Sequence, residues 1–112
     1  MRTQAVMFDI DDTLIDVDTG LGIQYAIDLL NRCAESGLRI VIITARPYYE
    51  RNYVWTARQL RDLDIYYDEL WFCPAPHKNK LKVKLGYDFL LSVGDQPTDL
   101  GESHRNILIS KH

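Results

Sequence analysis

The chain has 112 residues, 46% of them hydrophobic and 26% charged, which is enough for one small globular domain with its own core. Its formal net charge of −3 argues against a protein that is held to nucleic acid by bulk positive charge, although a local basic patch remains compatible with it. The sequence shows no basic-then-apolar leader and no apolar run of membrane-spanning length, so we expect a cytoplasmic protein without a membrane partner.

Strands and helices are predicted to alternate from the N-terminus. The continuous apolar run over residues 4–10 predicts a buried strand, and the glycines of residues 14–22 predict a loop. Apolar residues at helical spacing predict a helix over residues 23–34, which Gly37 ends. A second buried strand is expected over residues 39–44, followed by a helix over residues 47–62 with Pro47 at its first position.

The alternation continues in the second half of the chain. We expect strands over residues 69–73, 89–93 and 106–110, with a short helix over residues 79–85 that Gly86 ends. Cys33 and Cys73 are too few for a disulfide framework, and both are expected to be buried free thiols. The pattern predicts a single α/β domain over residues 1–112: a three-layer, Rossmann-like, parallel five-stranded sheet with helices on both faces.

Ligand sites in such sheets lie beyond the carboxyl ends of the strands, and the residues at these predicted ends are chemically complementary. They are Asp9, Asp11, Asp12 and Thr13 after the first strand, Thr44 and Arg46 after the second, His77, Lys78 and Lys80 after the third, and Asp95 and Asp99 after the fourth. Carboxylates can hold Mg²⁺, while a lysine and a hydroxyl can neutralise a phosphate. One carboxylate could attack phosphorus and another could move a proton, so the set predicts phosphoryl transfer.

The segment Asp9-Ile10-Asp11-Asp12-Thr13, then Thr44, a lysine, and Gly94-Asp95 with Asp99 resemble, in order, the four motifs of the haloacid dehalogenase superfamily. This resemblance covers nearly the whole chain. Residues 94–100 look like the fourth motif of plant-type acid phosphatases. Residues 65–70 look like the approach to the third strand in the 3′-phosphatase half of phage polynucleotide kinase. Both branch resemblances are partial.

The resemblance implies separate roles for the carboxylates. Asp9 resembles the nucleophile that forms an aspartyl-phosphate, and Asp11 resembles the general acid that then activates water. Asp95 would bind Mg²⁺ together with the Asp9 carboxylate and the backbone carbonyl of Asp11. Asp99 would act through a bound water or orient the lysine, and Thr13 would brace the first loop.

The resemblance further implies that Thr44 and a lysine bind the phosphate. Lys78 and Lys80 are both candidates, and Lys78 is preferred because it lies at the helix start nearest the strand ends. Thr44 could also cap the second helix. Arg46 could bind substrate or pair with an aspartate. Asp12 stands where the family most often has glycine, and we interpret it as a loop carboxylate in water.

Two larger sets of side chains have structural as well as functional interpretations. The arginines could follow a nucleic-acid backbone or form a solvated basic face, and the aromatic residues could stack on bases or pack in the core and at its rim. The sets are Arg51, Arg58 and Arg61, and Tyr48, Tyr49, Tyr53, Trp55, Tyr66 and Tyr67. We favour the structural interpretation for both sets, and we expect His77 to be an exposed loop residue.

The leading hypothesis is a Mg²⁺-dependent phosphatase without a cap domain, since the connections where relatives carry a cap are short. An open site suits a large phosphomonoester substrate such as a phosphorylated nucleic-acid end. Alternatives are a phosphatase of small nucleotides or sugars, a non-catalytic phosphate-binding module, and a phospho-receiver domain. The receiver would need a carboxylate at the end of the third strand, where Trp71-Phe72-Cys73 stands instead.

Overall fold

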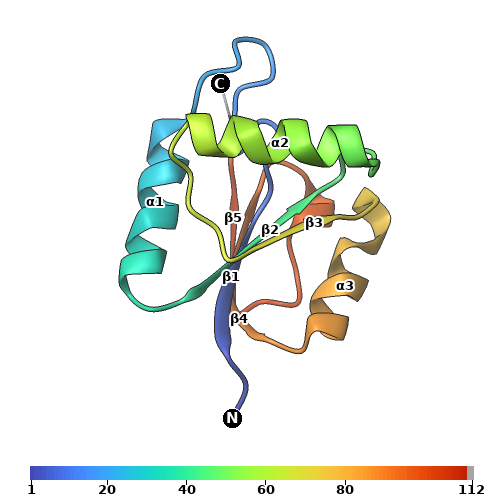
Figure 1. The fold of residues 1–112 in the computed structure, drawn as a ribbon. Helices are drawn as coiled ribbons and strands as arrows, with labels where there is room; N and C mark the ends of the chain where they lie inside the picture. Colours follow the sequence, from blue (N-terminus) through green and yellow to red (C-terminus); the bar gives the residue numbers. More distant parts are fainter. Residues whose placement is uncertain (111–112) are drawn as a thin grey trace.

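The computed structural model describes residues 1–110 and places all the strands of that range in one parallel sheet (Figure 1). The strands are β1 (Gln4–Phe8), β2 (Arg39–Thr44), β3 (Glu69–Phe72), β4 (Asp88–Gly94) and β5 (Arg105–Leu108). Their spatial order is β3-β2-β1-β4-β5, with β1 at the centre. The predicted fold class, a Rossmann-like five-stranded parallel sheet, is confirmed.

Helices cover both faces of this sheet (Figure 1). They are α1 (Gln24–Glu35), α2 (Glu50–Asp62) and α3 (Lys78–Leu85), and short 3₁₀ turns η1 (Ala75–His77) and η2 (Pro97–Asp99) precede α3 and β5. The buried apolar residues of α1 and α2 belong to the larger core cluster on one face, whereas α3 packs Leu81 and Leu85 on the other face. In the described range, the connections that follow β1 and β3 hold no inserted cap domain.

The central strands are apolar on both sides because both faces are covered. Val6 and Phe8 of β1 point into the larger cluster, while Ala5 and Met7 point into the smaller one, as the two-residue repeat of a strand requires. All four side chains are fully buried. This packing fixes the carboxyl end of β1, and with it Asp9, at the middle of one sheet edge.

The second helix begins at Glu50, so the expectation that it starts at Pro47 is wrong. Tyr49 is extended, with φ −156° and ψ 158°, and the side chain of Asn52 donates a hydrogen bond to the carbonyl of Pro47. Residues 47–49 therefore form a loop, in which the ring of Tyr48 packs against Phe72. The remaining predicted boundaries differ from the observed ones by one or two residues, the usual variation at element ends.

The structure shows which cysteine, aromatic and basic side chains are buried. Cys33 is buried, but Cys73 is only half-buried, so the prediction of a buried thiol is wrong there. Five of the aromatic residues are exposed, so they are not core residues. Packing at the rim is confirmed for Tyr67, which is half-buried against the larger core cluster, and for Tyr48 and Tyr53, whose rings contact Phe72. The arginine set and His77 are exposed, as predicted. No helix within residues 1–110 is long and apolar enough to cross a membrane.

Candidate active site

Three adjacent strands bring the predicted site residues to one edge of the sheet. Asp9 follows β1, Thr44 ends β2 and Asp95 follows β4, and β1 pairs in parallel with both neighbours. The side chains of Asp9, Asp95 and Asp99 can each offer an oxygen so that the three oxygens lie within 4.8 Å of one another. The parallel sheet therefore brings together carboxyl groups from two loops that are distant in the sequence.

Lys78 lies inside this carboxylate cluster. Its ammonium donates to Oδ1 of Asp9 at 2.9 Å and to Oδ1 of Asp99 at 2.6 Å. Lys78 is 2% exposed and Asp99 is 1% exposed, so the ion pair is almost dry. Lys80 is exposed on the same helix, so of the two candidate lysines only Lys78 contacts the cluster. Thr13 donates a longer hydrogen bond of 3.4 Å to Oδ2 of Asp9.

The charges of the cluster do not balance. The pKa of Asp9 is raised to about 7: burial is the largest cause, the Lys78 ammonium opposes it, and Asp99 and Asp95 add to the rise. Burial lowers the pKa of Lys78, but Asp9 and Asp99 outweigh burial and the net shift is upward, so Lys78 carries its charge. Three carboxyl groups thus face one ammonium. Hard oxygen donors at this spacing fit a divalent cation such as Mg²⁺, which would relieve the excess negative charge.

Asp11 lies beside the cluster and is held by Arg46. The guanidinium donates from Nη2 to Oδ1 at 2.8 Å and from Nε to Oδ2 at 3.0 Å. Its remaining nitrogen, Nη1, donates to Thr56 and Gln59 of α2. Of the two interpretations of Arg46, the structure contains the aspartate pair. This bidentate pair connects the loop after β1 to helix α2.

Thr44 and Asp12 each have a local backbone role. Thr44 is fully buried and its hydroxyl accepts a hydrogen bond from the N–H of Arg46, but it does not cap α2, which begins at Glu50. Asp12 has a positive φ of 60°, a conformation in which glycine is unstrained and aspartate is tolerated. Its carboxylate accepts from the N–H of Val17. This conformation is one that either a glycine or an aspartate can adopt.

Lys82 is a residue of the site region that the sequence interpretation missed. It is 1% exposed, and its ammonium donates to Oγ of Ser92 at 2.9 Å and to the carbonyls of Asp99 and Gly101 at 2.6 and 3.0 Å. It lies one helical turn after Lys78 and therefore shares its face. This four-residue spacing from Lys78, in a helix whose apolar packing comes only from Leu81 and Leu85, is the sequence signal that could have identified Lys82.

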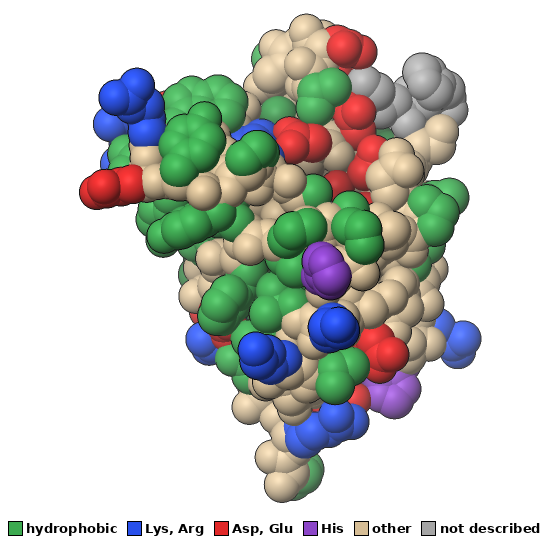
Figure 2. Space-filling model, turned by 90° about the vertical axis from the view of Figure 1, so that its right-hand side faces the viewer, with side chains coloured by type: hydrophobic (Ala, Val, Ile, Leu, Met, Phe, Trp, Pro, Cys, Tyr) green, Lys and Arg blue, Asp and Glu red, His purple; other side chains and the backbone are tan. Residues whose placement is uncertain are grey.

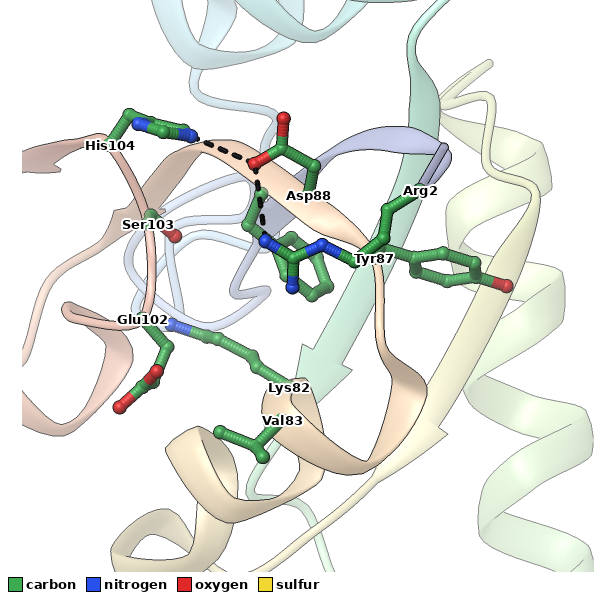
Figure 3. Close-up of a pocket in the computed structure, with 9 residues that line it drawn as sticks. Arg2, Lys82, Val83, Tyr87, Asp88, Glu102, Ser103 and His104 are labelled. Carbon is green, nitrogen blue, oxygen red and sulfur yellow. Dashed lines mark hydrogen bonds and ion pairs between the residues drawn. The ribbon is translucent and has the colours of Figure 1, made fainter.

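A separate cavity of about 430 Å³ lies against the outer side of Lys82 (Figure 3). Asp88 lies there between Arg2 and His104, at 3.9 and 2.8 Å. Asp88 begins β4, and Arg2 precedes β1, so this cavity is near the amino ends of the strands. It is at the opposite edge of the sheet from the carboxylate cluster, and Asp88 in it is paired with both Arg2 and His104.

The fold is that of an α/β protein with a cluster of three carboxyl groups at the carboxyl edge of its sheet, at a spacing that fits a divalent cation. The sequence pattern of the haloacid dehalogenase-like hydrolases matches residues 6–68, more than half of the chain. The chain therefore belongs to the haloacid dehalogenase-like hydrolase family. No curated protein matches it. The family match includes Asp9, Asp11 and Thr44 but ends before Lys78, so the later site residues depend on the structure alone.

Proposed function

We propose that this hydrolase is a Mg²⁺-dependent phosphomonoesterase that works through an aspartyl-phosphate on Asp9. The observation that carries the proposal is the buried contact of Lys78 with Asp9 and Asp99, next to Asp95. A carboxylate this close to an ammonium and to further carboxylates suits a nucleophile that must approach a negatively charged phosphate. Mg²⁺ held by Asp9, Asp95 and the Asp11 carbonyl would neutralise phosphate charge and orient the ester.

The chain's own groups can balance the reaction. A carboxylate oxygen of Asp9 attacks phosphorus, the bond from phosphorus to the leaving oxygen breaks, and Asp11 gives that oxygen its proton. Asp11 then takes a proton from water as the water oxygen attacks phosphorus, which releases phosphate and regenerates Asp9. Lys78 and the Thr44 hydroxyl bind the phosphate oxygens. Thr13 braces Asp9 through its hydrogen bond of 3.4 Å.

Arg46 and Asp99 position these groups. Arg46 donates to both oxygens of Asp11, and a proton on either oxygen competes with one of those bonds. A bound phosphate would compete for the same guanidinium, so Arg46 would bind substrate while it frees Asp11 for protonation. Asp99 holds Lys78 through Oδ1 and accepts from the N–H of Gln96 through Oδ2, which orients the lysine toward Asp9.

Because no cap domain is inserted in the described range, we propose a large substrate, and a phosphorylated nucleic-acid end as its class. A nucleotide or sugar phosphate is the smaller alternative. The test is phosphate release from 3′- and 5′-phosphorylated oligonucleotides beside nucleotides, sugar phosphates and an aryl phosphate. Release from small metabolites alone would contradict the nucleic-acid version but not the phosphatase.

The chemistry is tested with an aryl phosphate and its matched variants. Turnover should need Mg²⁺ and fall more than 10³-fold in Asp9→Asn, while the exposed loop variant Asp18→Asn should retain wild-type activity. Asp11→Asn should lose much less activity on an aryl phosphate, whose leaving group needs no proton, than on an alkyl phosphate. Equal losses on both esters would contradict the acid role of Asp11.

A further inference from the structure

A hollow beside Asp11 is separate from the carboxylate cluster. It encloses about 370 Å³, at the lower end of the range for small-molecule sites. One wall is formed by Ile15, Asp16, Val17 and Gly20, and the other by Tyr49 and by Asn52 and Trp55 at the start of α2. Asp11 and Arg46 line it where it meets the site. The hollow therefore begins at the proposed proton donor.

We propose that this hollow is the leaving-group subsite and that it takes a planar nucleobase, either of a free nucleotide or of the terminal nucleotide of a strand. The proposal rests on the proposed phosphatase function. In an in-line displacement the leaving oxygen lies across phosphorus from Asp9, and if Asp11 protonates it, the group attached to that oxygen lies beside Asp11. The hollow shares Asp11 and Arg46 with the site and is placed to receive that group.

The aromatic side chains of the hollow favour a flat ligand. Tyr49 and Trp55 are 56% and 54% exposed, which leaves large apolar rings in water. In Figure 2 the projecting surface at the upper left, where α2 lies, carries hydrophobic side chains, and acidic side chains gather beside it near the top. The Arg46 guanidinium lies 5.1 Å from the centre of the Trp55 ring, which steadies the ring by a cation–π contact. Stacking of a base on such a ring is sequence-tolerant and favourable.

The amide side chains of the hollow add hydrogen-bonding capacity. The nitrogen of Asn52 is engaged by the carbonyl of Pro47, and the oxygen of Gln59 accepts from Arg46. Among the described residues, nothing contacts the Asn52 oxygen or the Gln59 nitrogen by a hydrogen bond. One acceptor and one donor are therefore available in a hollow with aromatic walls. The edge of a base presents the same two kinds of group.

The experiment compares the wild-type enzyme with Trp55→Ala on three esters: a nucleoside monophosphate, a 3′-phosphorylated oligonucleotide and glycerol phosphate. We expect the ratio of kcat/KM for a base-bearing ester to kcat/KM for glycerol phosphate to fall about tenfold, the size of one lost stack. Trp55→Phe, which keeps a ring, should preserve the ratio within about threefold. Tyr66→Ala removes an exposed aromatic side chain that does not line the hollow and should preserve it as well.

The two base-bearing esters identify the source of the base. A fall for both indicates a site for the base itself, and a fall for only one assigns the site to free nucleotides or to strand ends. An unchanged ratio in Trp55→Ala, or a fall of the same size in Tyr66→Ala, would overturn the inference and leave the phosphatase proposal standing.

A binding measurement separates the subsite from the chemistry. In Trp71→Phe combined with Asp9→Asn, Trp55 is the remaining tryptophan and the nucleophile is absent. Nucleoside monophosphate should quench its fluorescence, and glycerol phosphate should not. If the wild-type protein hydrolyses none of the phosphate esters but nucleotide still quenches the fluorescence of the variant, the subsite is supported and the proposed function fails. No quenching by nucleotide or oligonucleotide would overturn the subsite.

Discussion

Replacing Lys78 by methionine tests whether the buried ammonium holds the carboxylate cluster together. Methionine keeps most of the side chain's volume and removes its charge. The ammonium lies 2.9 Å from Asp9 and 2.6 Å from Asp99, and the latter side chain is 2% exposed. Removal of one partner from a buried pair costs about 3–5 kcal/mol, because the other charge stays buried without compensation. We expect Lys78→Met to lose about 3 kcal/mol of unfolding free energy at neutral pH and essentially all turnover.

The unfolding free energy lost in Lys78→Met should depend on pH, and the titration of Asp9 determines whether the loss grows or shrinks as pH rises. Burial raises the pKa of Asp9 to about 7 in the folded protein, from an ordinary value of 3.8. A folded state that holds a proton more tightly than the unfolded state loses stability as pH rises between those values, by about 4 kcal/mol at most here. Without the Lys78 ammonium, which opposes this shift, the loss extends to higher pH. The variant should therefore differ least from the wild-type protein near pH 4 and most above pH 7.

The assay is urea unfolding of both metal-free proteins at pH 4.5 and 8, with Lys80→Met as the matched control on the exposed side of α3. Lys80→Met should match the wild-type protein at both values. Mg²⁺ should stabilise the wild-type protein more at pH 8 than at pH 4.5, since a cation binds the ionised form of Asp9. A pH-independent loss in Lys78→Met, or an equal loss in Lys80→Met, would refute this reasoning.

Gly94→Ala would place a Cβ 2.3 Å from a carboxylate oxygen of Asp99, so we expect about 1–3 kcal/mol of lost stability by urea unfolding, together with lost turnover. Lys82→Met removes the ammonium that fixes the Asp99 carbonyl. It should lower kcat about tenfold, whereas the exposed Lys84→Met should retain wild-type activity. Asp12→Gly removes the strain of a positive φ but also loses the hydrogen bond from Val17. The two effects oppose each other, so the free energy of unfolding should change by less than about 1 kcal/mol. A tenfold loss of activity in that variant would indicate that Asp12 is a ligand.

The sheet and the convergence of the site were predictable because they depend on patterns that local chemistry fixes. Continuous apolar runs identify central parallel strands, and parallel strands bring their carboxyl ends to one edge. Asp9, Thr44 and Asp95 were therefore placed at one edge from the sequence. Lys78 could be chosen over Lys80 because helix geometry gives the two residues different directions.

The errors have a common physical origin in contacts between segments distant along the chain. Pro47 is a favourable first residue of a helix, but the contact of Tyr48 with Phe72 and the hydrogen bond from Asn52 keep residues 47–49 in a loop. Lys82 was not among the site residues predicted from the sequence. Its burial depends on Ser92 and on carbonyls of the loop after β4, and no local pattern indicates their approach.

The two buried lysines show that the interior near α3 is arranged around charge. Burial lowers the pKa of Lys82 to about 8, so keeping this ammonium inside opposes folding at neutral pH, while its three acceptors offset part of the cost. An apolar side chain would pack the same face without that cost. Lys82 donates to the backbone carbonyl of Asp99, and Lys78 donates to its side-chain carboxylate. The two lysines therefore hold both the backbone and the side chain of Asp99 in place. Helix α3 is thus attached to the sheet by the groups that position the carboxylate cluster, and its stability is coupled to the charge of that cluster.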